Sequence, residues 1–322
     1  PDNTERLGGF LQQATALSAL NLSGTGINEA LLRVLNFPEH ISELQLRNNA
    51  LGDTDLEPLI QLLHQGRFRS LNLGWNSFTL AGLQTLGAAL TNHTLLTHLD
   101  LSSNSLGMEG CQILHSSLAY QASLKDLILT ECDLKDDACY PLAKLLKTNT
   151  TLAFLDISFN KIGVEGCEVL GEALTYNFSL TQLKMRDNHL RDKGCIALCA
   201  ALQQNKSIHN LDLSWNGIGI VGSAAICDLL KHNQTLKELV LLHNYFTQEE
   251  LDMFTHAVND NAQLQHLQLV KNRLVSPQIE AKMEPLERKI ARNHIRHLTL
   301  LDWISNPPPN RQSDTTNPGP PL

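Results

Sequence analysis

A short apolar motif recurs along the chain at a nearly constant interval, and this spacing restricts the possible folds more than any other feature. Aliphatic residues stand at its first, fourth and sixth positions and asparagine usually at its ninth, as in Leu96, Leu99, Leu101 and Asn104. The first positions are Leu17, Ile41, Phe68, Leu96, Leu124, Leu152, Leu180, Ile208, Leu236 and Leu264. From Phe68 onward the 28-residue interval is constant. A repeat of this length predicts about ten copies of one unit stacked in a row.

Each unit should contain a strand followed by a helix. Apolar residues at the fourth and sixth positions alternate as in a short strand with one buried face. The stretch that follows, such as 164–176, has helical spacing through Cys167, Leu170 and Leu174. Neighbouring strands lie ~4.8 Å apart whereas packed helices need ~8–10 Å, so the helical side is longer. The sequence therefore predicts an α/β solenoid bent into a right-handed horseshoe, with one parallel sheet on its concave side.

The asparagine at the ninth position is expected to pair with buried backbone groups where each strand turns. Thr25 replaces it in the first unit and Cys132 in the fifth. We therefore expect a looser turn toward the N-terminal end.

The chain divides into four segments. Residues 1–16 should form an N-terminal cap and residues 17–275 the repeat domain. Residues 276–305 should form a C-terminal cap, with a helix that begins near Ser276 and Pro277 and a degenerate strand that has Trp303 in place of the asparagine. Residues 306–322 are rich in proline and lack apolar periodicity, which predicts a disordered tail.

A second, 56-residue period overlies the first from the fourth to the ninth unit. The strings LDLSSN, LDISFN and LDLSWN alternate with LILTEC, LKMRDN and LVLLHN. Together with the unit length, the Ile-Gly-x-x-Gly step at Ile162 to Gly166 and a full helix per unit, this resembles the ribonuclease-inhibitor type of leucine-rich repeat, over about Leu17 to Leu274. The same type occurs in NOD-like receptors and in effectors of intracellular bacteria.

The resemblance implies a fold and a general function. In such proteins the concave face commonly docks a protein partner, and ribonuclease inhibitor blocks its target by covering the active site. Residues that recur between units build the solenoid, so those that vary carry the binding information.

Charge and composition narrow the classes of partner. A net charge of -8 and a pI near 5.9 disfavour nucleic acid and anionic membranes. No stretch approaches the roughly 18 apolar residues of a membrane span. Seven cysteines, an odd number, fit a reducing compartment better than a secreted disulfide scaffold. We therefore expect a monomeric cytoplasmic protein, located in the host cytosol if the chain is a bacterial effector.

The third, fifth, seventh and eighth positions of each unit are expected to face the concave side. The eighth position holds Trp75, Phe159 and Trp215, with His243 in the next unit. Large exposed aromatic side chains are enriched among interface hot spots, so this row is a candidate set of partner anchors. The alternative is that these aromatics belong to the repeat consensus and cover a neighbouring turn.

Charged residues stand beside this row. The fifth position holds Asp100, Asp156 and Asp212 in alternate units, either as partner contacts or as part of the LDLS consensus. Lys184 and Arg186 break the pattern of their column, and they are candidates either for partner contacts or for a solvated basic pair. Charges of both signs contribute more to the rate and the orientation of partner association than to its affinity.

Three other sets of residues could suggest chemistry. The cysteines at Cys111, Cys139, Cys167 and Cys195 occupy equivalent helix positions ~8–10 Å apart, too far for disulfides, and are expected to be small buried hydrophobes. Cys195 and Cys199 share a helix face but lack the other ligands of a zinc site.

The remaining two sets are asparagines and histidines. Asparagines that begin an Asn-x-Ser/Thr triplet are either glycan acceptors or loop residues fixed by the repeat; they are Asn92, Asn149, Asn177, Asn205 and Asn233. His243, His266 and His297 could approach one another, but no carboxylate or thiolate completes a metal site. We therefore predict no catalytic residue, no metal and no cofactor.

The sequence favours a protein-binding module that is not an enzyme. The alternatives are a GTPase-activating or other enzyme-regulating repeat protein, and the sensor fragment of a larger receptor. The partner-binding residues expected on the concave face are Trp75, Asp100, Asp156, Phe159, Lys184, Arg186, Asp212, Trp215 and His243.

Overall fold

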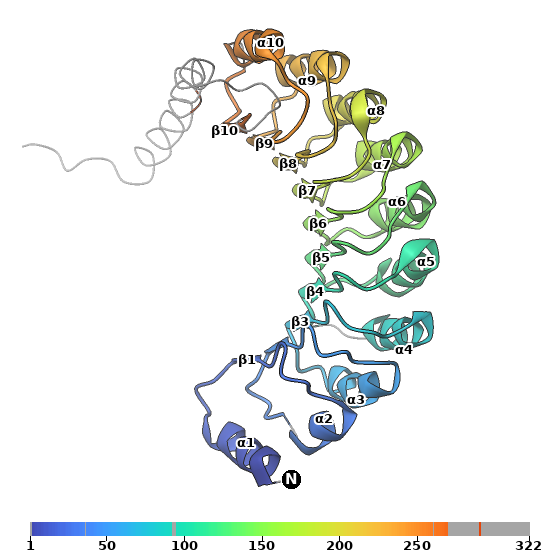
Figure 1. Ribbon diagram of the computed structural model, residues 1–322, viewed down its shortest axis with the longest axis vertical. Coiled ribbons are helices and arrows are strands. Elements are labelled where there is room, and N and C mark those ends of the chain that lie inside the picture. The colour runs from blue at the N-terminus through green and yellow to red at the C-terminus, as the bar shows by residue number, and fades with distance from the viewer. Residues whose placement is uncertain (1, 36, 92–94, 260, 270–289, 291–322) are drawn as a thin grey trace, which may run out of the picture.

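One parallel sheet lines the inner side of an arc, and helices cover its outer side (Figure 1). The computed structural model describes residues 2–35, 37–91, 95–259, 261–269 and 290. The ten strands of the sheet follow one another in chain order, so each unit adds its strand beside the preceding one. These strands are β1 (Ala19–Asn21), β2 (Glu43–Gln45), β3 (Ser70–Asn72), β4 (His98–Asp100), β5 (Asp126–Ile128), β6 (Phe154–Asp156), β7 (Gln182–Lys184), β8 (Asn210–Asp212), β9 (Glu238–Val240) and β10 (His266–Gln268). The predicted α/β solenoid is confirmed.

The helices lie between successive strands along the chain. They are α1 (Asp2–Gln13), α2 (Glu29–Leu35), α3 (Glu57–His64), α4 (Leu80–Thr91), α5 (Gly107–Leu118), α6 (Cys139–Thr148), α7 (Val164–Tyr176), α8 (Arg191–Gln204), α9 (Ile220–His232) and α10 (Gln248–Asn259), with short 3₁₀ turns η1 (Thr54–Leu56) and η2 (Asp136–Ala138). Helix α1 precedes the first strand and packs against α2, with Leu11 buried. The predicted cap at 276–305, including Trp303, and the tail at 306–322 lie outside the described residues, Ile290 excepted.

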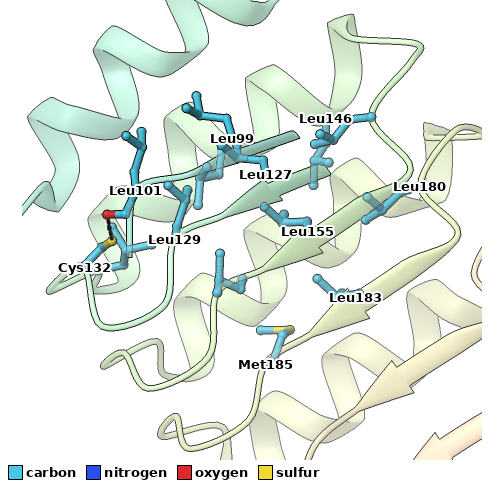
Figure 2. Packing of buried hydrophobic residues seen from close by; sticks show 14 of the residues in the cluster. Leu99, Leu101, Leu127, Leu129, Cys132, Leu146, Leu155, Leu180, Leu183 and Met185 are labelled. Atoms are coloured by element: carbon cyan, nitrogen blue, oxygen red, sulfur yellow. Dashed lines mark hydrogen bonds between the residues drawn. The ribbon is translucent and has the colours of Figure 1, made fainter. Parts of the chain in front are cut away.

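The core consists of rows of leucines that run from unit to unit. The middle residue of each strand is a leucine in register with its neighbours, as in the run Leu99, Leu127, Leu155 and Leu183 (Figure 2). The sixth positions are also buried, and Met185 takes this place in the seventh unit. Each unit thus buries its apolar residues against the next, as a solenoid requires.

The ninth-position asparagines form a buried ladder at the end of the strands. The Asn160 amide donates to the carbonyls of Leu129, Ile157 and Ser158, and its oxygen accepts from the backbone N–H groups of Cys132 and Leu134. One side chain therefore satisfies backbone groups of two adjacent units.

The turns with substituted ninth positions keep the same construction, contrary to the looser turn expected near the N-terminus. The thiol of Cys132 lies 3.4 Å from the Leu101 carbonyl oxygen (Figure 2), and the Thr25 hydroxyl donates to the Leu22 carbonyl. Both side chains retain a donor at the place of the amide, which explains why the turn survives.

A second asparagine ladder lies where each helix leads into the next strand. Asn205 donates to the carbonyls of Leu174 and Asn177 and accepts from the N–H groups of Ser207 and Ile208. Asn149, Asn177 and Asn233 are equally buried. These asparagines are structural, since their amides are buried and the fold leaves no space for an attached glycan. Asn92 lies outside the described residues.

Aspartates link adjacent units in step with the 56-residue period. Asp136 Oδ1 accepts from the N–H groups of Gly163 and Gly166 at the start of α7, at 2.6 and 3.0 Å. Asp192 makes the same pair of bonds to Gly219 and Gly222 at the start of α9, at 2.7 and 3.1 Å. Each aspartate caps the helix of the following unit. At Gly166 a Cβ would lie 2.7 Å from Asp136 Oδ1, so the glycine permits this approach.

The cysteines pack in the core as expected. All seven are free and buried. Burial raises the pKa of the Cys132 thiol to about 12 and that of Cys227 to about 11, because the thiolate would lose its hydration. The neutral thiols therefore act as small apolar side chains.

Candidate functional site

The concave face is formed by the strand side chains that point away from the core and by the turns that follow the strands. The third and fifth positions are at least partly exposed from β4 to β9, as the alternation predicts. The seventh position differs from the prediction at three serines: Ser102, Ser158 and Ser214 are 4%, 3% and 0% exposed. The chain turns inward there, and the larger side chains of Thr130 and Arg186 are partly exposed at the same position.

The eighth position has an unusual backbone. From the first to the ninth unit its φ lies between 52° and 66°, the left-handed region that favours glycine and asparagine. The residues in this row are Gly24, Asn48, Trp75, Ser103, Glu131, Phe159, Asp187, Trp215 and His243. A bulky aromatic residue in this conformation costs ~1 kcal/mol or more, so packing alone does not favour the tryptophans.

The aromatic residues of this row stand on the surface. Trp75, Phe159 and Trp215 are 49%, 42% and 44% exposed. Trp215 stacks on His243, with ring centroids 4.1 Å apart and an interplanar angle of 23°. The Arg47 guanidinium lies over Trp75 at 5.4 Å. These contacts fix the orientation of each ring while leaving one side open.

The aspartates of the fifth position are engaged within the fold. Asp100 accepts from the N–H and hydroxyl groups of Ser102 and from the Asn72 amide. Asp212 has the same relation to Ser214, and Asp156 accepts from the Ser158 N–H group. Each aspartate therefore helps to hold the strand end, which is the role expected of a consensus residue, and it remains partly exposed.

Lys184 and Arg186 lie differently. The Lys184 ammonium is 5.3 Å from the centroid of the Phe154 ring, and the Arg186 guanidinium is 5.4 Å from that of Phe159. Within the described residues neither cation forms an ion pair or a side-chain hydrogen bond, and the Arg186 Nε is buried without an acceptor. These are basic groups held in place by aromatic rings rather than by acids.

Two hollows open beside these residues. The first, of about 370 Å³, lies on β7–β10 and is lined by Gln182, Leu183, Lys184, Arg186, Asn210, Leu211, Asp212, Glu238, Val240, Leu242 and Gln268. The second, of about 490 Å³, lies on the turns that follow β7–β9 and is lined by Asp187, Asn188, His189, Arg191, Trp215, Asn216, Gly217 and Tyr245. Lys184, Arg186 and Asp212 thus share one hollow and Trp215 borders the other, while Trp75 and Asp100 lie several units away.

Sequence reasoning missed several surface residues. Phe154, whose ring lies under Lys184, occupies a third position. A search for aromatic residues at concave-face positions of the adjacent units would have found it. Tyr245 is exposed two residues after the eighth position, in a column that has no recurrent residue type. Its role in lining the second hollow depends on how the turn closes, which periodicity does not specify.

The described residues offer no evident centre for catalysis. They contain no group of three or more histidines, cysteines or acids placed to hold a metal ion. His297, the third member of the conceivable histidine group, falls in the part of the chain left undescribed. No described helix has the length and apolarity to cross a bilayer.

Comparisons with known proteins agree with this architecture. The profile of the family described as Leucine Rich repeat matches residues 92–113, 148–171, 176–199 and 204–227. The matched segments follow the repeat register and omit the fifth unit, which carries Cys132. Over these segments the chain is similar to leucine-rich repeats. Such repeats typically serve as protein-interaction scaffolds, and no catalytic family is indicated.

One solved structure of a leucine-rich-repeat protein shares the fold of this chain. The leucine-rich repeat-containing protein LegL7 from Legionella pneumophila is 19% identical, with 88% of this chain and 94% of that chain covered and a TM-score of 0.54. A structure described as Leiomodin-1 Actin-Binding Site 2 is 16% identical, with 73% of this chain and 95% of that chain covered and a TM-score of 0.33. Among curated proteins no sequence gives a significant match. The similarity to LegL7 extends over nearly the whole repeat array.

Proposed function

We propose that this leucine-rich-repeat protein binds a protein partner on its concave face, with the aromatic eighth-position row as anchors. The observation that carries the proposal is the left-handed backbone beneath Trp75, Phe159 and Trp215. Glycine and asparagine adopt this backbone conformation with less strain, so the aromatic rings are better explained by binding than by folding.

The proposed face suits a protein surface. It combines rigid, half-exposed rings with hydrogen-bonded acids and open cations, which is the composition of interface hot spots and their polar surroundings. Its strands are locked into a continuous sheet, so little ordering is needed when a partner binds. We infer that the bound partner is masked over the contacted area, and that an enzyme bound in this way would be inhibited.

The finer assignments are proposals of the same kind. The unit length, the 56-residue period and the helix in each unit support the ribonuclease-inhibitor type. Seven buried free thiols support a reducing compartment such as the cytoplasm. We propose that the protein is a monomer. We also propose that it does not bind nucleic acid, because the net charge of -8 repels phosphate. An effector role is a further hypothesis, which the origin of the partner would decide.

The test uses the immobilised protein to capture partners from a lysate, followed by mass spectrometry and purification of the captured protein. The variant Trp75→Asn/Trp215→Asn removes both rings and places asparagine, which tolerates the left-handed conformation. We expect its affinity for the purified partner to fall at least about a hundredfold, the usual effect of losing two hot spots.

A matched control removes exposed aromatics from another surface. Tyr120 lies two residues after α5 and Tyr176 is the last residue of α7, and both are strongly exposed away from the eighth-position row. The variant Tyr120→Ser/Tyr176→Ser should retain the partner. Loss of binding in the tyrosine variant with full binding in the tryptophan variant would contradict the proposed face.

A further inference from the structure

The hollow on β7–β10 has an imbalance between its acids and its cations. On β4–β9 every acid at a third or fifth position receives a donor from the chain itself. Asp126 Oδ2 lies 2.5 Å from His98 Nε2, and Glu238 Oε2 accepts from the Asn210 amide at 2.7 Å. The three fifth-position aspartates accept from serine N–H groups. The cations Lys184 and Arg186 receive no acceptor within the described residues. The two cations of this surface are therefore open to an anion, although the chain as a whole is acidic.

The two cations are also held in place before any ligand arrives. Lys184 lies in register with Asp156 on one side and Asp212 on the other, yet it is ion-paired with neither and packs over Phe154. Arg186 packs over Phe159 with its Nε buried. Aromatic rings stabilise cations without using their N–H groups, so these donors remain available.

The floor of the hollow favours one kind of anion. Leu183 and Leu211 form buried parts of it, and Val240 and Leu242 are half-buried beside them. An aliphatic floor suits the methylene groups of an acidic side chain. A phosphate group would bring about two charges next to Asp156 and Asp212, whereas a carboxylate brings one.

We propose that this hollow receives an aspartate or glutamate side chain of the protein partner, whose carboxylate is bound by Lys184 and Arg186. The proposal rests on the concave-face function and specifies the partner's chemistry at one point. Charge-assisted bonds to a carboxylate are about twice as strong as neutral ones, and the guanidinium can bind both oxygens. The exposed amides of Gln182 and Gln268 are further donors at the rim.

The test selects a displayed library of short random peptides on the immobilised wild-type protein. The peptides retained are those whose binding is lost in Trp75→Asn/Trp215→Asn. We expect the retained peptides to share an acidic residue. A labelled peptide should lose binding about tenfold to a hundredfold, by fluorescence anisotropy, either when its acid is changed to the amide or when the protein is Lys184→Gln/Arg186→Gln. The two changes together should cost little more than one, because they remove the same contact.

The control variant is Lys147→Gln/Lys161→Gln, which removes the same charge from cations that already pair with Glu172 and Asp133. Binding should be unaffected by this change. Equal loss in both variants would reduce the effect to overall charge and overturn the proposal. Tryptophan-dependent peptides without an acidic residue would also overturn it while leaving the concave-face function in place. If no tryptophan-dependent peptide is selected, both are contradicted.

Discussion

The eighth and ninth positions of each unit are neighbours in sequence but differ in every physical respect. From the fourth to the ninth unit the ninth side chain is buried, hydrogen-bonded to two units and nearly constant. The eighth is at least partly exposed, lies on a left-handed backbone and varies from Gly24 to Trp215. The turn thus assigns stability to one residue and leaves the adjacent one free to vary, at a small cost in stability where that residue is aromatic; this variable residue is the one that we propose contacts the partner.

The largest contrast should appear in thiol chemistry. Cys132 is a ninth-position residue, and Glu131 before it is an exposed eighth-position residue. Because burial raises the pKa of Cys132 to about 12, its thiolate is scarce near pH 8. In a Glu131→Cys variant the new thiol should react with a disulfide reagent about a thousandfold faster than Cys132, as followed by mass spectrometry of labelled peptides. Comparable reaction rates of the two thiols in the folded protein would mean that the ninth position is not protected from solvent.

The next contrast concerns stability. Asn160→Ala removes five hydrogen bonds and leaves their backbone partners buried, so we expect a loss of about 3 kcal/mol or more in the free energy of unfolding, measured with urea. The adjacent Phe159→Ala should cost about 1 kcal/mol or less, since its ring is partly in water. Similar losses for the two variants would remove the distinction between the positions.

The smallest effect is expected for an aromatic residue replaced by the residue type its backbone prefers. Trp215→Asn loses the stacking on His243, worth about 0.5–1.5 kcal/mol, and relieves left-handed strain of similar size. The unfolding free energy should stay within about 0.5 kcal/mol of the original, by the same urea measurement. A loss above about 2 kcal/mol, beyond the range of ordinary surface substitutions, would assign the ring to the fold instead of to binding.

Most of the fold could be predicted from the sequence because each unit repeats the same physical problem. The leucine rows, the asparagine ladder and the buried cysteines follow from the 28-residue spacing alone. The burial of Ser102, Ser158 and Ser214 could not be predicted, because it depends on how far the chain turns inward after each strand. The persistence of the turns at Thr25 and Cys132 could not be predicted from the spacing, because it depends on a hydroxyl or a thiol donating where the amide would.

The candidate site was less accessible to prediction. The eighth-position aromatics could be located in the sequence, but their left-handed backbone could not. The pairing of Lys184 with Phe154 and of Arg186 with Phe159 joins residues of adjacent units. Whether a lysine packs on a ring or pairs with a flanking aspartate depends on side-chain geometry that periodicity leaves open.

The aspartate bridges between units determine how the array can change in length. Asp136 serves the helix of the sixth unit and Asp192 that of the eighth, so the fifth to eighth units form two doublets. Removing only the seventh unit would place Val164 where Gly219 and Gly222 need an aspartate. Removing the sixth and seventh units together would bring Asp136 to that place and leave every cap matched. Between the fifth and eighth units, shortening this protein without loss of these caps therefore proceeds two units at a time.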